Sequence, residues 1–273
     1  MIHRITRAWR RIAADVSPRS HFDAYRTFLE EAIDRGYQIV SLDTWISLLR
    51  EGRCPERFVA LRHDVDIDDV DGNTAFFEIE RELGARSTFF FRLSTMHPHR
   101  QLIDALLNES FDVGYHYEEL STHAKQHGWS GRDLDKVLPE VRSTFRANCE
   151  RFRSEANPEL TAVAAHGDWM NRRLGIANTA LIDRSLLDEC GLRFEAYDPE
   201  LTEGADLYLT DTRQPPQSWT KENEWVATLG SSDHIYALAH DRIWSGNVPP
   251  KIAATLHRVG DVMRYQIRHG QRS

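Results

Sequence analysis

Residues 58–68 read FVALRHDVDID, a short apolar run that passes directly into an acidic segment. Six more apolar runs of similar length follow, and amphipathic helical stretches separate several of them. These runs span residues 87–92, 111–115, 161–165, 193–197, 206–210 and 235–239. Short apolar strands that alternate with helices are typical of a mainly parallel sheet covered on both faces. The pattern predicts an α/β fold, a distorted (β/α)7 barrel of parallel strands, with an open doubly wound sheet as the alternative.

Upstream of this barrel, residues 1–57 are predicted to form a helical extension packed on it. Residues 58–273 then form the barrel, in a single domain overall. An apolar stripe predicts a helix over 22–35, which Gly36 ends. Ser41 is a plausible N-cap for a second helix over 42–50. Whether the barrel closes between its last and first strands is left open.

The composition excludes several classes of protein. With 41% hydrophobic and 28% charged residues in 273, the chain is expected to fold. Its 42 acidic and 34 basic residues give a net charge of −8, which argues against a general nucleic-acid binder. The sequence contains no run of about 18 apolar residues, so no transmembrane segment is predicted. The basic, amphipathic residues 1–16 could touch a membrane surface, although a solvated helix face is the simpler interpretation.

The cysteines suggest a location for the protein. Cys54, Cys149 and Cys190 are odd in number and form no CxxC pair. Neither a disulfide framework nor a cysteine zinc site is therefore indicated. A reducing cytoplasm is the simplest expectation.

Polar residues follow almost every predicted strand at the point where it ends. In chain order they are His63, Asp64, Asp66, Arg92, His116, His166, Asp211 and His240. The carboxyl ends of parallel strands meet at one edge of a sheet, where α/β proteins place their active sites. We therefore expect these side chains to surround one cleft.

The carboxylates Asp64 and Asp66 suggest a metal. Neighbouring carboxylates repel each other, which raises one pKa unless a cation lies between them. A divalent ion held by one would leave the other free as a base. Neutral imidazoles from His116 and His166 would suit zinc and its neighbours in the divalent series. The alternative is an acidic loop or helix cap, because more aspartates follow at 68, 69 and 71.

The seventh strand leads to an imidazole that could donate a proton. We expect Asp211 to pair with His240 and favour its protonated form. Trp244 would wall the pocket, or serve only in core packing. Two histidine pairs are set aside, His97 with His99 as a solvated loop, and His123 with His127 because nothing nearby in the sequence completes a site.

The order of these motifs resembles the polysaccharide deacetylase superfamily, the NodB-homology domain of carbohydrate esterase family four. The resemblance covers roughly residues 58–245 and rests on four segments. These are Asp64-Val65-Asp66, the strand segment ARSTFFFR at 85–92, the segment DVGYH at 112–116, and Leu238-Ala239-His240. The chain resembles an outlying branch, because Leu120 stands where the family usually has a second histidine and His166-Gly167-Asp168 replaces its Arg-x-Pro motif.

The resemblance implies roles for individual residues. Asp64 matches the general base, Asp66 the metal-binding carboxylate, His116 the first metal imidazole and His240 the general acid. A third protein ligand must come from Glu119, His123, His166 or a water, and we rank His166 first. Asp64 and His240 are expected to face each other on opposite sides of the metal. His63, Arg92, Asp211 and Trp244 are expected to surround the substrate and the reacting groups.

The function that the resemblance implies is a metal-dependent deacetylase, a hydrolase of carbon–nitrogen bonds other than peptide bonds. It would remove an N-acetyl group from an amino sugar, polysaccharide or glycan precursor, with a divalent metal such as zinc as cofactor. Its partner is then a carbohydrate or N-acetylated sugar. One alternative is another metallohydrolase on the same barrel. The other is a non-catalytic carbohydrate-binding relative that has lost the full metal site.

Overall fold

A computed structural model describes residues 17–213 and 224–270 of the chain. Its sheet contains eight strands, and every pairing between them is parallel. The strands are β1 (Gln38–Val40), β2 (Phe58–Val65), β3 (Thr88–Phe91), β4 (Asp112–Tyr117), β5 (Ala162–Ala165), β6 (Phe194–Glu195), β7 (Leu207–Thr210) and β8 (His234–His240). All seven predicted runs are therefore strands, and the predicted parallel α/β architecture is confirmed.

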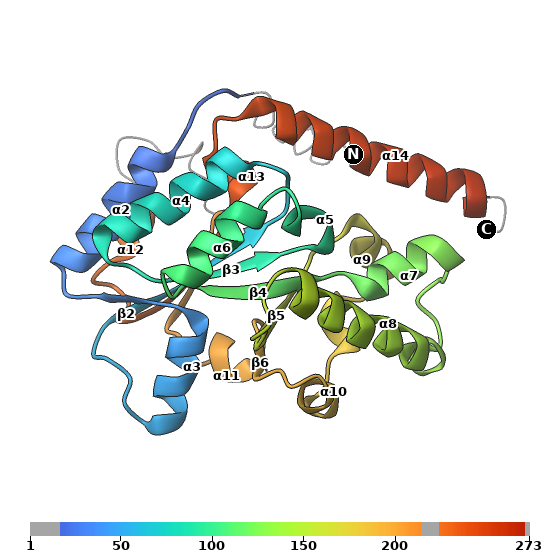
Figure 1. Cartoon of the computed structure of the whole chain (residues 1–273), viewed down its shortest axis with the longest axis horizontal. Coiled ribbons are helices and arrows are strands. Elements are labelled where there is room, and N and C mark those ends of the chain that lie inside the picture. The colour runs from blue at the N-terminus through green and yellow to red at the C-terminus, as the bar shows by residue number, and fades with distance from the viewer. Residues whose placement is uncertain (1–16, 214–223, 271–273) are drawn as a thin grey trace.

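Helices surround this sheet (Figure 1). In the first half of the chain they are α2 (Phe22–Asp34), α3 (Leu42–Glu51), α4 (Val70–Leu83), α5 (Leu93–Met96), α6 (Arg100–Asn108) and α7 (Glu119–His127). The second half has α8 (Leu134–Glu155), α9 (Trp169–Leu174), the 3-10 helix η1 (Asn178–Leu181), α10 (Arg184–Glu189), α11 (Pro199–Thr202), α12 (Glu224–Thr228), α13 (Asp241–Trp244) and α14 (Val248–His269).

The sheet curls into a half-barrel with strand order β6-β5-β4-β3-β2-β8-β7. The last strand pairs with the first strand of the predicted barrel, with Phe58 opposite His234 and Asp64 opposite His240. The open side lies instead between β6 and β7, which have no pairing within the described parts of the chain. The distorted seven-stranded barrel is thus confirmed, and it is incomplete. It closes where β8 meets β2, and its opening lies between β6 and β7.

Side chains alternate between the two faces of each strand, as a pleated backbone requires. In β2, Leu61 and Val65 point to the outer face, where α2, α4 and α6 contribute to one large apolar cluster. Ala60 points to the inner face with Phe90, Ala162 and other inward residues. The small side chains of Ala60 and Ala162 on this concave face leave room for the ring of Phe90.

Gly114 shows how tight the concave face is. A Cβ atom at this position would lie 2.4 Å from Cε1 of Phe90, closer than real contacts allow. The glycine therefore makes space for the Phe90 ring two residues before His116, on the same face of β4. This packing gives a physical reason for the glycine in the segment DVGYH.

Residues 17–57 contribute two helices and one strand. Ser41 caps α3 by accepting a hydrogen bond from the Thr44 backbone N–H, and Gly52 ends it with φ of 65°, as predicted. The strand β1 pairs with the first half of β2, so this segment extends the sheet itself. The division at residue 57 stays a prediction, and residues 1–16 lie outside the described ranges. No described helix combines the length and hydrophobicity needed to cross a bilayer.

Candidate active site

Three of the predicted strand-end residues form a tight cluster at the carboxyl edge of the sheet. Asp66 Oδ1 lies 3.3 Å from His116 Nε2 and 3.1 Å from His166 Nδ1. The two imidazole nitrogens are themselves 3.3 Å apart. The residues come from the loop after β2, from β4 and from the end of β5. These are the three residues that the sequence analysis assigned to the metal, and together they offer one ligand atom each to a single point.

The geometry of this cluster fits a divalent ion. Ligands held about 2.0–2.2 Å from a tetrahedral zinc are about 3.3–3.6 Å from each other, and the separations of 3.1–3.3 Å observed here are close to that range. Asp66 Oδ1 is buried, and no described donor makes a hydrogen bond with it. His116 Nδ1 lies 3.0 Å from the carbonyl oxygen of Ala164, so Nδ1 carries the proton in the neutral ring and Nε2 presents its lone pair to the cluster.

Electrostatics favour an ionised carboxylate in the cluster. Burial alone would raise the pKa of the Asp66 carboxyl, but the neighbouring imidazoles of His166 and His116 hold it well below its usual range. A carboxylate that is ionised and a neutral imidazole are the forms that bind a metal. The cluster therefore has the donor set and the charge that a metal site requires.

Asp64 lies directly beside this cluster on the concave face, paired with a buried arginine. Arg62 donates from Nε and Nη2 to the two carboxylate oxygens at 2.9 and 2.8 Å. The guanidinium also donates to the hydroxyls of Tyr236 and Tyr197, and it stacks 4.4 Å from the centre of the Tyr197 ring. Burial alone would raise the pKa of Asp64, but Arg62 and the nearby imidazoles lower it. Asp64 is therefore held as a fixed carboxylate.

Arg62 was missed by the sequence analysis, although a signal was present. It is the only charged residue in the run 58–62, and a charged side chain in a buried strand is almost always paired. Residues at i and i+2 of a strand share a face, so its partner was to be expected at Asp64.

His240, at the end of β8, is held by the predicted partner Asp211. Its Nδ1 donates to Asp211 Oδ1 at 2.7 Å, and its backbone N–H donates to Asp211 Oδ2. Trp244 Nε1 donates to the same Oδ2 at 2.9 Å, so the indole orients Asp211. Burial alone would lower the pKa of His240, but Asp211 and the nearby Asp66 and Asp64 raise it to about 10. The ring is therefore an imidazolium at neutral pH.

The two predicted proton-transfer groups are close together. Asp64 Oδ2 lies 3.8 Å from His240 Nε2 and 3.5 Å from His116 Nε2. Asp64 therefore adjoins both imidazoles, whereas we expected it to face His240 from the far side of the metal. The carboxyl ends of β2 and β8 pair in register at these two residues, and this pairing brings them side by side.

Asp241, which the sequence analysis did not single out, ties the loop that carries Asp66 to β8. Its Oδ2 accepts from the Ile67 backbone N–H at 3.3 Å and from Asn73 Nδ2 at 3.0 Å. Asp241 is fully buried, and burial with the nearby charge of Asp66 raises its pKa to about 8. This network joins the residue after His240 to the turn between β2 and α4.

Arg92 lies next to the cluster as expected. It donates to Glu118 Oε1 at 2.6 Å and to the backbone carbonyl of Asp66 at 3.3 Å. Burial raises the pKa of Glu118, but Arg92, with His166 and Lys125, outweighs this and brings it down to about 2. Arg92 thus holds the loop that presents Asp66, while its own charge is balanced by Glu118.

His63 is not part of the cleft, which corrects our expectation. Its side chain points to the outer face of β2, because it alternates with Arg62 and Asp64. There it is buried, with Nε2 2.6 Å from Glu80 Oε1, and Tyr25 donates to the same oxygen. His63 therefore belongs to a buried polar network between α2, α4 and β2.

The other candidates for a third ligand lie elsewhere. Leu120 is fully buried in the outer apolar cluster, and Glu119 accepts from Tyr115 and Asn148. His123 faces Glu140, 3.8 Å away, and with His127 these side chains form a second, looser group of possible ligands on α7 and α8. We expected nothing near this histidine pair in the sequence to complete a site, and Glu140 approaches it only because α7 packs on α8.

The pair His97 and His99 also differs from our expectation. His97 is mostly exposed, as a solvated loop residue should be. His99 is fully buried, where Nδ1 donates to the Thr95 carbonyl and Nε2 contacts Asn73. Neither residue is near enough to the cluster to join the described ligand groups.

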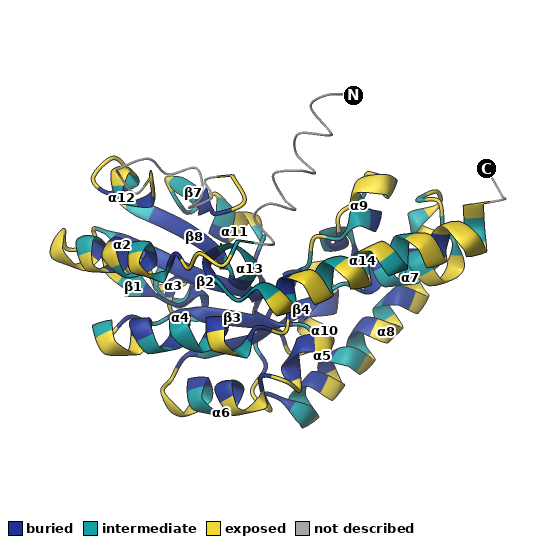
Figure 2. Ribbon diagram, turned by 90° about the horizontal axis from the view of Figure 1, so that it is seen from above, coloured by how far each residue is buried: buried dark blue, intermediate teal, exposed yellow. Residues whose placement is uncertain are grey.

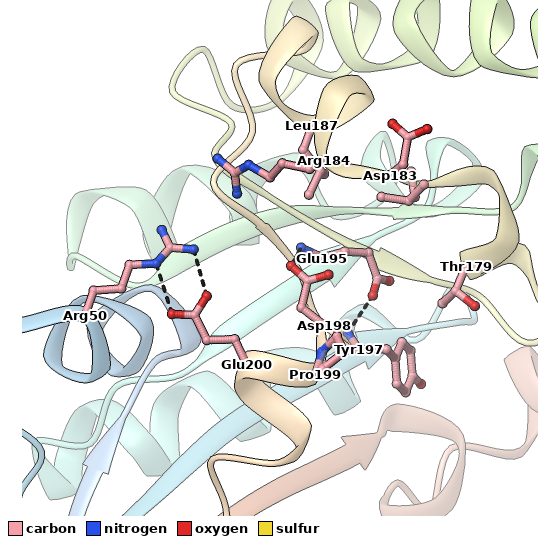
Figure 3. A pocket seen from close by; sticks show the side chains of 11 residues that line it. Arg50, Thr179, Asp183, Arg184, Leu187, Glu195, Tyr197, Asp198, Pro199 and Glu200 are labelled. Carbon is pink, nitrogen blue, oxygen red and sulfur yellow. Dashed lines mark hydrogen bonds and ion pairs between the residues drawn. The ribbon is translucent and has the colours of Figure 1, made fainter.

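A cavity of about 450 Å³ lies beyond Tyr197, beside the edge strand β6 (Figure 3). Glu195 and Asp198 line it, with Arg184 from α10 and Arg50 from α3. None of the residues of the Asp66 cluster lines this cavity. The hydroxyl of Tyr197 reaches Arg62, so one side chain separates the cavity from the Arg62–Asp64 pair.

Comparisons with known proteins were made on sequence and on structure. No protein-family model and no curated protein matches the sequence. Matches among solved structures include a pseudoenzyme of carbohydrate esterase family 4 from Bacillus anthracis, with 11% identity and a TM-score of 0.43 over 80% of this chain and 66% of that one. The peptidoglycan deacetylase PdaC from Bacillus subtilis has 14% identity and a TM-score of 0.43, over 75% of this chain and 85% of its own.

A family 4 carbohydrate esterase from Streptomyces lividans, in complex with acetate, has 16% identity and a TM-score of 0.38. That match covers 78% of this chain and 90% of the esterase. All three structures are of the family that the sequence motifs resemble. Because the identities and TM-scores are low, we base the function on the geometry of this chain's own residues.

Proposed function

We propose that this chain is a metal-dependent hydrolase that removes an N-acetyl group from an amino sugar, polysaccharide or glycan precursor. One observation carries the proposal. A carboxylate with lowered pKa, Asp64, and an imidazolium with raised pKa, His240, lie 3.8 Å apart beside a three-residue ligand cluster. Titratable groups whose environments push their pKa values apart are the pattern of a paired base and acid.

Asp66, His116 and His166 would hold the metal, and zinc suits one carboxylate and two imidazoles. When bound, such an ion polarises the acetamide carbonyl and lowers the pKa of a coordinated water. Asp64 accepts the proton of the attacking water while its carboxylate is held in place by Arg62. His240 donates the proton on Nε2 to the leaving nitrogen as the carbon–nitrogen bond breaks. The products are acetate and a free amino sugar.

The proposal places the enzyme in the cytoplasm, in keeping with cysteines that show no disulfide pattern. A second candidate function is a non-catalytic carbohydrate-binding protein. The bidentate Arg62–Asp64 pair favours it, because both carboxylate oxygens already accept hydrogen bonds and a lowered pKa weakens a base. Another metallohydrolase activity on the same barrel would use the same groups on a different bond.

Two measurements test the proposal. The first is the zinc content of protein purified without chelator, for which we expect one ion per chain. The second is acetate release from a panel of N-acetylated sugars by the zinc-loaded protein. The variants Asp64→Asn and His240→Ala should each lower turnover by roughly 10²–10⁴-fold, the usual contribution of a general base or acid.

His234→Ala is the matched control, because His234 lies at the opposite end of the same strand, β8. It should retain wild-type turnover. If a substrate is found and both site variants retain full turnover, Asp64 and His240 do not carry the reaction. If the protein binds no metal and releases no acetate, the carbohydrate-binding function replaces the proposal.

A further inference from the structure

Exposed apolar side chains gather on one helix of this molecule. Six large hydrophobic residues are exposed among the described residues, and five of them lie on α14. They are Ile252, Leu256, Val259, Met263 and Ile267, with exposed fractions between 41% and 81%. The sixth, Ile33, lies alone on α2. Scattered single residues of this kind are normal on a protein surface, but a row of five on one helix is not.

The five residues form one continuous stripe. Their spacing of four, three, four and four residues keeps them within about 80° of each other on a helix of 3.6 residues per turn. The helix has 22 residues, so its length is about 33 Å. The exposed side runs along the whole of α14 in Figure 2.

The opposite side of α14 packs against the body of the protein. Tyr265 is buried against Trp169 of α9, with ring centres 5.6 Å apart. Thr255 accepts a hydrogen bond from Arg242 of α13, and His269 packs closely on Gly128 after α7. These contacts fix which side faces outward, and they leave the apolar stripe without a cover among residues 17–213 and 224–270.

The charge of α14 opposes that of the whole chain. The helix has four basic residues and one acidic residue, whereas the chain carries a net charge of −8. Arg264 and Arg268 are exposed on one side of the stripe, where Arg264 pairs with Asp261 of the same helix. Such an exposed pair is weak, so Arg264 can exchange this partner for an anionic surface. An apolar stripe with exposed arginines on the neighbouring polar side is the pattern of a helix that lies in the interface of an anionic membrane.

We propose that the outward face of α14 docks on the surface of an anionic lipid bilayer, with the helix axis parallel to the membrane. The apolar stripe would enter the boundary between headgroups and acyl chains, and Arg264 and Arg268 would contact lipid phosphates. This membrane-docking proposal does not depend on the proposed deacetylase activity.

Docking would also orient the candidate active site. The helices α9 and α13, on which α14 packs, begin within a few residues of His166 and His240. The stripe therefore lies at the same end of the sheet as the ligand cluster, and docking would hold this end near the lipid. The described chain also starts beside α14, because Pro18 contacts Gly246, and residues 1–16 before it contain four arginines.

Flotation with vesicles tests the proposal on the full-length protein. We expect the protein to float with vesicles of phosphatidylglycerol and phosphatidylcholine in equal parts, and salt should release it from them. With vesicles of pure phosphatidylcholine, the protein should remain at the bottom of the gradient. The double variant Leu256→Ser/Met263→Ser should lower the partitioning of the protein onto the anionic vesicles at least about tenfold. Arg264→Gln/Arg268→Gln should lower it roughly 25-fold, at about fivefold for each arginine. Ile33→Ser is the matched control for an exposed apolar residue elsewhere, and should bind as wild type does.

Three results would overturn the proposal. The first is wild-type binding by the Leu256→Ser/Met263→Ser variant, or no preference for anionic vesicles. The second is a wild-type protein that binds no vesicles but is a dimer in light scattering, while the Leu256→Ser/Met263→Ser variant is a monomer. This result would assign the stripe to a second copy. The third is loss of binding in a full-length Trp9→Ser/Ile12→Ser variant while the α14 variants still bind, which would assign the contact to residues 1–16.

Discussion

Replacing Asp211 with asparagine should lower the pKa of His240 and make catalysis fail progressively as the pH rises. Asp211 accepts from His240 Nδ1 at 2.7 Å, and its negative charge is the main cause that opposes the effect of burial. With that charge the pKa of His240 is about 10. Without it, burial still lowers the pKa and only the charges of Asp66 and Asp64 raise it, so the pKa should fall towards the ordinary value of about 6.5.

The expected loss follows from the protonated fraction of His240. In the wild type almost every molecule carries the proton at pH 7, and about nine in ten still do at pH 9. With a pKa of about 6.5, about a quarter do at pH 7 and about 0.3% at pH 9. Loss of the acid form alone should therefore reduce turnover by about fourfold at pH 7 and by about 300-fold at pH 9.

Stability should follow the same titration. Because the folded pKa is raised, the Asp211–His240 pair stabilises the folded state fully below about pH 6.5, and this contribution is lost as the pH rises towards 10. The gap in unfolding free energy between wild type and Asp211→Asn should therefore shrink over this range. Urea unfolding at several pH values measures it.

Two assays check the prediction, the pH profile of acetate release and an NMR titration of the His240 imidazole, which needs no substrate. Asp206→Asn is the matched control, because Asp206 lies 3.8 Å from His234 at the exposed opposite end of the same two strands. It should leave both the profile and the His240 titration unchanged. A loss of turnover in Asp211→Asn that is equal at every pH, with an unshifted imidazole titration, would refute the reasoning.

Three further predictions concern single side chains. His166→Ala removes one of three ligands, so zinc affinity in a calorimetric titration should fall by more than the roughly 10–100-fold that losing an outer hydrogen bond costs. Arg62→Met leaves Asp64 buried without its cation and should cost about 3–5 kcal/mol in urea unfolding, whereas Arg57→Met, which breaks an exposed pair, should cost below about 1 kcal/mol. Glu80→Gln weakens the buried network around it and should cost about 1–3 kcal/mol by the same method, with acetate release unchanged.

The sequence by itself determined the strands and the residues at their ends. Short apolar runs, helix caps and glycines act over a few residues, so they can be recognised without the partners they will meet in space. The ligand cluster was predictable for the same reason, because parallel strands carry their carboxyl ends to one edge. Side-chain alternation would also have separated His63 from Asp64, since adjacent residues of a strand face opposite sides.

Only the tertiary structure decided which of these groups touch. The position of the opening between β6 and β7, the 3.8 Å approach of Asp64 to His240, and the carboxyl that Glu140 offers to His123 all depend on strand order and helix packing. The side of α14 that faces outward was decided in the same way, by the contacts of Tyr265 with α9. Contacts between segments distant in the chain arise from the packing of whole elements, and no local pattern of residues encodes them.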